Sequence, residues 1–330
     1  MPRLGRELKM AFANANISDI IATTIESRSR SIADNVTNNN ALLKKLEQRG
    51  RIKTASGGSK ILQELSFAEN TNAGWYSGYD LLPVGISDVI SAAEFDWKQA
   101  AVPVVISGLE MLQNAGKEQM IDLLDSRMEV AEATLQNLIA TGIYSDGTGA
   151  GGKEITGLDA AVPLDPTTGT YGGIDRATWT FWRSQIQNSG DTDTLLADMN
   201  GLWATLVRGT DRPDIIVMDA VTWEAYVAAL QAQQRFNSAD VGDLGFPTLK
   251  FMGTDVVLDG GIGGACPAGT AFFLNTKYLH YRPHANRNMV PLSPNRRYAT
   301  NQDAEVQIIG WAGNLTCSGA QFQGRLDVNP

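Results

Sequence analysis

Cysteine, histidine and long apolar runs are all scarce in this sequence of 330 residues. The two cysteines, Cys266 and Cys317, have no C-x-x-C spacing and give no metal or redox signal, so we expect two reduced, structural thiols. The longest uncharged apolar run, AAVPVVI at 100–106, is too short to span a bilayer, and the opening MPRLGRELKMAFANANISD lacks an apolar signal-peptide core. We therefore expect no membrane partner and a protein that is made and kept in the cytoplasm.

Positive charge is in deficit and unevenly placed. The chain has 27 Lys and Arg against 36 Asp and Glu, a formal net charge of -9, which argues against a dedicated nucleic-acid binder because affinity for phosphate backbones comes from clustered Lys and Arg. Residues 1–60 hold eleven Lys or Arg and five Asp or Glu, whereas the remaining 270 residues hold sixteen and thirty-one. The pattern indicates a basic arm on an acidic body. The arm either docks onto an acidic surface, of its own chain or of a copy, or is a solvated face.

One glycine-rich stretch invites a nucleotide-binding interpretation. Gly147, Gly152 and Lys153 in GTGAGGKE match the first seven positions of the phosphate-binding loop G-x-x-x-x-G-K-[ST]. Such a loop must leave a buried strand and enter a helix, so that backbone N–H groups converge on the phosphate. Here a long predicted helix precedes the glycines, the strand-like KEITGLDAAV follows them, and Glu154 replaces the hydroxyl residue. We interpret the stretch as a flexible connector and predict no nucleotide cofactor.

No other pattern supports catalysis or metal binding. His280 and His284 have the spacing of helical zinc ligands, but Pro283 forbids a helix interior there. In an extended chain the two imidazoles lie about 13 Å apart at about 3.3 Å per residue, so we expect surface residues at a strand edge. Asp191 and Asp193 form a D-x-D pattern that we interpret as helix capping, because an apolar helix follows directly. The sequence predicts no catalytic residue, no metal ion, no cofactor and no enzyme.

Residues 60–107 predict a two-stranded excursion from the body, after helices over 17–36 and over ALLKKLEQRG, which ends at Gly50. KILQELSFAE indicates one strand, and AAEFDWKQAAVPVVIS indicates the returning strand. The tip NAGWYSGYD combines glycines with three aromatic residues, which are Trp75, Tyr76 and Tyr79. Because an isolated hairpin is marginally stable in water, we expect these aromatics to be buried against something else, such as a neighbouring copy of the chain.

The clearest helix covers residues 117–140 and is expected to end at Gly142. It spans roughly 36 Å at about 1.5 Å per residue. Its predicted core face carries Met120, Leu124, Met128, Leu135 and Leu138.

The second half of the chain alternates helices with strands. Helices are expected over 194–209 and 220–236, and strands over DIIVM, LKFMGTDVVLDGG, GTAFFLNTKYLHY and AEVQIIGWAGNLTC. In the last of these, Val306 and Ile308 alternate with Gln307 and Ile309, so we expect a strand that is half exposed on one face.

The order of these elements resembles the major capsid protein of tailed bacteriophages with the Hong Kong 97 type fold. The resemblance covers nearly the whole chain and depends on FDWKQAAVPVVISGLEMLQNAG, GGKEITGL, PDIIVMDAVTWEAYVAAL, GTAFFLNTKYL and GWAGNLTC, in that order. It implies four parts of an α+β Hong Kong 97-like fold. They are an N-terminal arm at 1–55, an extended β-hairpin called the E-loop at 56–106, a peripheral P-domain with the long spine helix at 107–171 and 281–330, and an axial A-domain at 172–280.

The resemblance also implies a function, which is assembly of an icosahedral phage head around double-stranded DNA. The implied partners are copies of the chain in hexamers and pentamers, a portal, and scaffolding or decoration proteins, and the implied location is the virion capsid after assembly in the host cytoplasm. The residue pattern agrees on one point, because arm and loop need partners to be stable. Three alternatives stay open: an encapsulin-like bacterial nanocompartment, a nucleotide-dependent enzyme built on the Gly147 loop, and an adhesin or carbohydrate-binding module.

Overall fold

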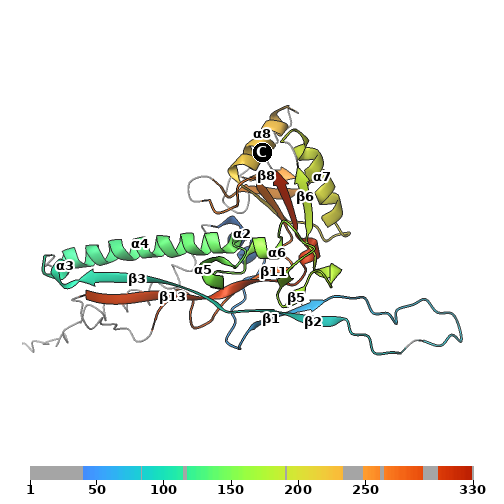
Figure 1. Cartoon of the computed structure of the whole chain (residues 1–330), viewed down its shortest axis with the longest axis horizontal. Coiled ribbons are helices and arrows are strands. Elements are labelled where there is room, and N and C mark those ends of the chain that lie inside the picture. Colours follow the sequence, from blue (N-terminus) through green and yellow to red (C-terminus); the bar gives the residue numbers. More distant parts are fainter. Residues whose placement is uncertain are drawn as a thin grey trace, which may run out of the picture.

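The computed structural model describes residues 40–82, 84–113, 117–189, 192–232, 248–260, 264–292 and 304–328. The predicted helix over 17–36 and the last residues of the helix predicted over 220–236 lie outside these ranges. Figure 1 shows a long, flat lower layer, a compact upper unit that rises from one part of it, and a hairpin that extends away from both.

Two strands from opposite ends of the chain form the centre of the lower layer. β3 (Lys98–Ser107) and β13 (Ala304–Cys317) pair antiparallel over ten residue pairs. The other edge of β13 pairs with β12 (Val290–Pro291) and β11 (Leu279–Pro283). In Figure 1 this sheet lies beneath the long helix α4 (Lys117–Tyr144), which runs alongside β3.

β13 is more deeply buried than its alternating sequence predicts. Gln307 is buried and so is every residue from 309 to 317, so the expectation of a half-exposed strand is wrong for this part. The reason is that both faces are covered. Ile309 and Trp311 join the main core, and on the other face the Asn314 side chain accepts from the Thr156 N–H at 2.9 Å and donates to the Asp96 carbonyl at 2.9 Å.

α4 extends one turn beyond the predicted end and joins the two units. Gly142 lies inside the helix, and a Cβ on it would come within 3.1 Å of Ile155 Cδ1, so this glycine serves close packing and not termination. Two residues later the Tyr144 hydroxyl donates to Asp259, which directly follows a strand of the upper unit. Burial raises the pKa of Tyr144, so the hydroxyl keeps its proton.

Six strands form the sheet of the upper unit, in the order β6, β14, β10, β7, β9, β8. Their bounds are β6 (Gln185–Ser189), β14 (Gly324–Val328), β10 (Thr270–Leu274), β7 (Ile215–Met218), β9 (Thr254–Leu258) and β8 (Thr248–Phe251). The helices of the unit are α7 (Leu195–Leu206) and α8 (Ala220–Ala232). Ile216 and Met218 pack in the cluster with α7, whereas Ile215 and Val217 join the main core. Both faces of β7 are therefore covered, which explains its continuous apolar run.

The last strand corrects the expected domain division. β14 pairs antiparallel with β10 and parallel with β6, and its residues Leu326 and Val328 pack in the cluster with α7. The sequence assigned all of 281–330 to the peripheral domain, and this is wrong for β14. After β13 the chain returns to the upper unit and fills a position between two strands that precede it in sequence.

The end of the predicted arm also belongs to the body. α2 (Ala41–Gln48) begins at Asn40, whose side chain accepts from the N–H groups of Leu42 and Leu43 at 3.0 and 3.1 Å. Gly50, with φ 63°, lies just after its end, as the sequence predicted. Leu42 and Leu43 are fully buried in the main core. The expectation that the arm needs another chain for its stability is therefore wrong for this helix.

Short elements complete the chain. The strand-like appearance of KEITGLDAAV was misleading, because this segment contains helix α6 (Leu158–Ala161), with Leu158 and Ala161 turned into the core. The others are α3 (Gly108–Gln113), α5 (Gly149–Gly152), β4 (Thr170–Tyr171), β5 (Ile174–Asp175), η1 (Thr180–Trp182), η2 (Thr192–Thr194) and η3 (Ala320–Phe322).

Truncation of one arm leucine tests whether α2 is part of the core. We expect Leu43→Ala to lower the free energy of unfolding by about 2–5 kcal/mol, because it leaves a cavity at a fully buried site. Glu47→Ala, at an exposed position of the same helix, is the control and should change it by less than about 0.5 kcal/mol. Urea unfolding of single subunits measures both. Equal, small effects of the two substitutions contradict the core position.

Candidate assembly surfaces

A two-stranded hairpin begins where the lower layer ends. β1 (Ile61–Ser66) and β2 (Ile90–Phe95) pair antiparallel over six residue pairs, and the Phe67 N–H adds a hydrogen bond to the Val89 carbonyl at 3.1 Å. The returning strand of the prediction is therefore two strands, since β2 ends at Phe95 and β3 begins at Lys98. The two residues between them carry the chain from the hairpin into the lower sheet.

The root of the hairpin is fixed by the body. The Phe95 ring packs edge-on against Tyr171 with ring centroids 5.2 Å apart, and both side chains are buried. The Glu94 N–H donates to the Gly172 carbonyl at 2.8 Å. A Cβ at Gly172 would approach both Ala93 and Phe95 to 3.0 Å, and its φ of 58° also favours glycine. The direction in which the hairpin leaves the body is thus set by packing.

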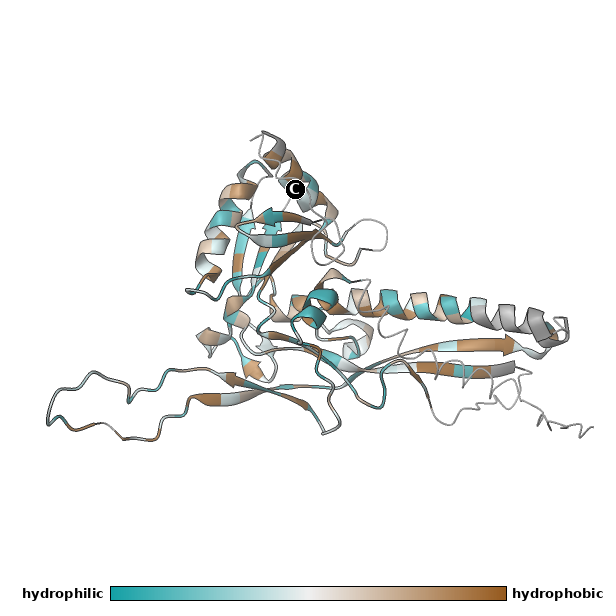
Figure 2. Cartoon of the chain, turned by 180° about the vertical axis from the view of Figure 1, so that it is seen from behind, coloured by the Kyte–Doolittle hydropathy of each residue, from teal (hydrophilic) through white to brown (hydrophobic). Residues whose placement is uncertain are grey.

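Phe67 still packs on the body, with its ring centroid 5.6 Å from that of Phe181, but the distal half of the hairpin, residues 70–82 and 84–88, has no such cover. Trp75 and Tyr79 are fully exposed and Tyr76 is 67% exposed. The other exposed large apolar residues of the hairpin are Leu62, Leu81, Leu82, Val84, Ile86 and Ile90. Figure 2 shows apolar and polar residues interspersed along the hairpin, whose distal half has no other described part of the chain beside it. Within one chain, the aromatic tip is not buried.

In the spine helix, α4, only some of the predicted core residues face inward. Met128 and Leu135 are fully buried. Leu138 is 49% exposed, and Ile139 takes the next buried position, so the core assignment of Leu138 is wrong in the single chain. Positions 128, 131, 135 and 139 follow the spacing of three and four that one helix face requires, and 138 falls at its edge. Met120 and Leu124 lie in α4, but their side chains are outside the described ones.

The exposed Leu138 borders an apolar groove of about 320 Å³ between α4, the start of β3 and the glycine-rich turn. The Lys98 ammonium donates to the Gly152 carbonyl at 2.5 Å and so joins β3 to that turn. The carboxylate of Glu154 fills the space inside the glycine-rich turn. Glu154 accepts from the Ser145 hydroxyl at 2.8 Å and packs onto Gly149, where a Cβ would collide with it. An anionic group at this place opposes phosphate binding.

The two histidines do not form one site. His280 is only 5% exposed, which corrects the expected surface position: β11 is covered and the imidazole faces inward. The His284 ring lies edge-on to Trp97 with centroids 5.1 Å apart, and its Nδ1 accepts from the Asn286 N–H at 3.0 Å. Over the described ranges, no group of three or more His, Cys, Asp and Glu has an arrangement that could hold a metal ion.

Both cysteines are unpaired thiols, as the sequence predicted. Burial raises the pKa of the Cys317 thiol to about 12 and also raises that of Cys266, which keeps both in the unreactive thiol form. In the part of the chain that the structure describes, no helix combines the length and the apolar character needed to cross a membrane.

Comparison with known proteins identifies the fold. No family model and no curated protein sequence matches the chain. Among solved structures, a chain of the cyanophage A-1(L) capsid asymmetric unit is similar, with a TM-score of 0.64 and 18% identity over 85% of this chain and 91% of that chain. A capsid chain of the native GTA particle follows, with a TM-score of 0.59 and 15% identity over 87% and 90%. A chain of Mycobacterium phage Bobi has a TM-score of 0.52 and 11% identity over 86% and 90%. The chain has the α+β fold of tailed-phage capsid proteins, which confirms the fold implied by the sequence resemblance.

Acid titration of stability tests the burial of His280. Burial, followed by the charges of Arg282, Arg51 and Lys53, lowers the pKa of His280 from 6.5 to about 4. Because the folded pKa lies below the unfolded one, the contribution is complete above pH 6.5 and is lost as the pH falls toward 4. We expect His280→Gln to remove about 1–3 kcal/mol of the pH dependence of the unfolding free energy in this window. His284→Gln, at the only other histidine, is the control and should keep the wild-type slope. Identical slopes for all three proteins contradict the prediction.

Proposed function

We propose that this chain is the major capsid protein of a tailed bacteriophage, whose copies assemble as hexamers and pentamers into an icosahedral shell around double-stranded DNA. The observation that carries the proposal is the hairpin, because its root is held by the body while its aromatic tip is uncovered. The capsid fold supports the same conclusion, since the similar chains come from capsids of a cyanophage and of a GTA particle.

Hydrophobic burial is sufficient to drive such contacts. One aromatic side chain buries about 150–250 Å² when it is covered, and each Å² contributes about 25 cal/mol before the costs of association. Trp75, Tyr76 and Tyr79 together give a gross gain on the order of 10 kcal/mol per hairpin. In a closed ring each copy offers one hairpin and receives another, so every subunit takes part in two contacts and the ring holds one contact per subunit.

The charge of the chain fits a container for nucleic acid. Residues 61–330 carry sixteen Lys or Arg and thirty-one Asp or Glu, so a wall built from this body repels DNA more than it binds it. Such a wall permits dense packing and later release of the genome. The proposal includes a portal and scaffolding or decoration proteins as further partners, and assembly in the host cytoplasm before the protein becomes part of the virion.

Electron microscopy of the purified chain, alone and with the products of neighbouring genes for a portal and a scaffold, tests the function. We expect closed shells of uniform size that contain DNA when isolated from infected cells. Shells that enclose an enzyme and no DNA indicate a bacterial nanocompartment instead. A compact monomer that stays single with all assembly partners present contradicts both.

Removal of the aromatic tip tests the surface that carries the proposal. We expect the triple variant Trp75→Ser, Tyr76→Ser and Tyr79→Ser to retain the wild-type unfolding midpoint, because these side chains are exposed in the single chain, and to lose shell formation at least tenfold in yield. Leu164→Ser, which changes a 55% exposed leucine outside the hairpin, is the control and should assemble normally. Sedimentation and microscopy give the yield. Normal shells from the triple variant show that the tip has no role in assembly.

A further inference from the structure

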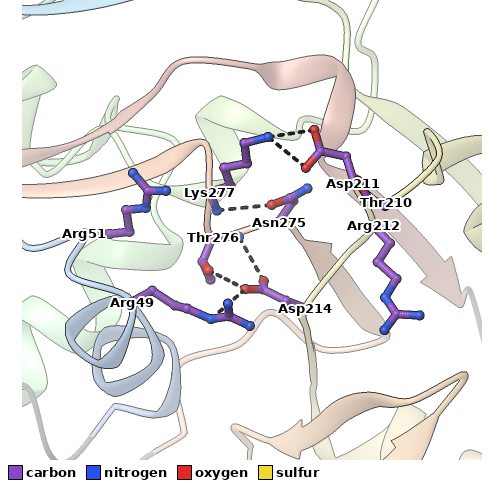
Figure 3. Close-up of a pocket in the computed structure, with 9 residues that line it drawn as sticks. All are labelled: Arg49, Arg51, Thr210, Asp211, Arg212, Asp214, Asn275, Thr276 and Lys277. Atoms are coloured by element: carbon purple, nitrogen blue, oxygen red, sulfur yellow. Dashed lines mark hydrogen bonds and ion pairs between the residues drawn. The ribbon is translucent and has the colours of Figure 1, made fainter.

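A charged pocket of about 340 Å³ lies where α2, the turn before β7 and the turn after β10 meet (Figure 3). Its basic side chains come from three separate segments of the chain, and they are Arg49, Arg51, Arg212 and Lys277. Two carboxylates, those of Asp211 and Asp214, also line it. Four cations and two anions leave a formal charge of +2 in a pocket of a chain whose total is -9.

Both carboxylates are occupied by contacts within the chain. Asp211 accepts from the Lys277 ammonium at 2.9 and 3.0 Å and from the Tyr278 hydroxyl at 2.7 Å, and the Lys277 contact lowers the pKa of Asp211. Asp214 accepts from the Thr276 N–H at 2.9 Å and from the Thr276 hydroxyl at 2.5 Å, and it lies 3.6 Å from Arg49 Nε. The negative charges of the pocket are therefore already compensated, and they hold its walls together.

Two guanidinium groups are left for an external anion. Arg51 and Arg212 stand on opposite sides of the pocket in Figure 3, and neither guanidinium contacts another of the nine residues drawn there. Arg51 Nε is buried and has no hydrogen-bond acceptor. A buried donor without an acceptor costs free energy that a ligand oxygen can restore, and guanidinium groups favour planar oxyanions such as carboxylates.

We propose that this pocket binds carboxylates from the distal hairpin of a second copy of the chain. The inference rests on the assembly proposed above and names the polar part of the same contact. Residues 61–97, which include the whole hairpin, contain six Asp or Glu and no Lys or Arg. A strand pair that is acidic along its full length complements a basic pocket and steers two copies into one relative orientation.

The hairpin of the same chain does not fill this role. Its Glu69 lies 3.6 Å from Arg208, whose backbone pairs with that of Asp211, but neither Glu69 nor Arg208 lines the pocket. Figure 1 shows the rest of the hairpin extending away from the body, so its far end lies apart from the pocket of its own chain. A DNA phosphate is the less suitable occupant, because duplex binding depends on a basic stripe, and here the charges are confined to one pocket of an acidic body.

Charge reversal on both surfaces tests the pairing. We expect Arg51→Glu with Arg212→Glu to keep the wild-type unfolding midpoint and to raise about tenfold the protein concentration at which half of the subunits are assembled. Asp80→Lys with Asp88→Lys on the hairpin should have a similar effect. A chain with all four substitutions should assemble within about threefold of wild type, because opposite charges face each other again. Lys250→Glu, at an exposed lysine outside the pocket, is the matched control and should assemble as wild type.

The outcomes separate this inference from the proposed function. Wild-type shells together with normal assembly of the pocket variant overturn the pocket contact and leave the capsid function standing. Failure of the four-substitution chain, when each charge-reversed pair is folded, overturns the hairpin as occupant. Normal empty shells of the pocket variant that retain less DNA assign the pocket to phosphate and also overturn the inference. Absence of shells from the wild-type chain contradicts the capsid function itself.

Discussion

The long antiparallel contact between β3 and β13 is the constraint on which the rest of the molecule depends. It joins a strand from the first third of the chain to one near its end, and it forms the sheet beneath α4. β13 is followed by β14, which lies within the upper sheet. The chain therefore passes from the lower layer into the upper unit, back to the lower layer and up again. The two units are interlocked by their connections, so each is built from segments that are not contiguous in the sequence.

This interlocking explains how a thin body can hold an elongated hairpin without support at its far end. The root packs Phe95 against Tyr171, and Asn314 of β13 links the chain between β2 and β3 to the turn after α4. The hairpin is thereby connected to the antiparallel pair of β3 and β13. A stiff root with an uncovered tip suits a part that must meet another molecule at a set angle, because little conformational freedom is lost when the contact forms.

Local periodicity in the sequence was sufficient for elements whose environment is simple. α4, β7 and the first hairpin strand, β1, follow from the spacing of their apolar residues. Two of the failures share one cause, which is dependence on distant segments. GRLDV has no local sign that it inserts between β6 and β10, and the burial of His280 depends on the cover over β11. Leu138 lies at the edge of a helix face, where one residue of rotation separates core from surface. The charged pocket was not foreseen, because its arginines come from segments far apart in the sequence.

The absence of Lys and Arg from residues 61–97 has a consequence for proteolysis. Trypsin has no cleavage site within this segment, and the Lys and Arg residues that flank it are Lys60, which pairs with Glu94 at 2.7 Å, and Lys98 at the start of β3. Proteases that cut after aromatic residues meet the opposite situation at Trp75 and Tyr79. The projecting segment itself is thus open to one class of protease and offers no cleavage site to another.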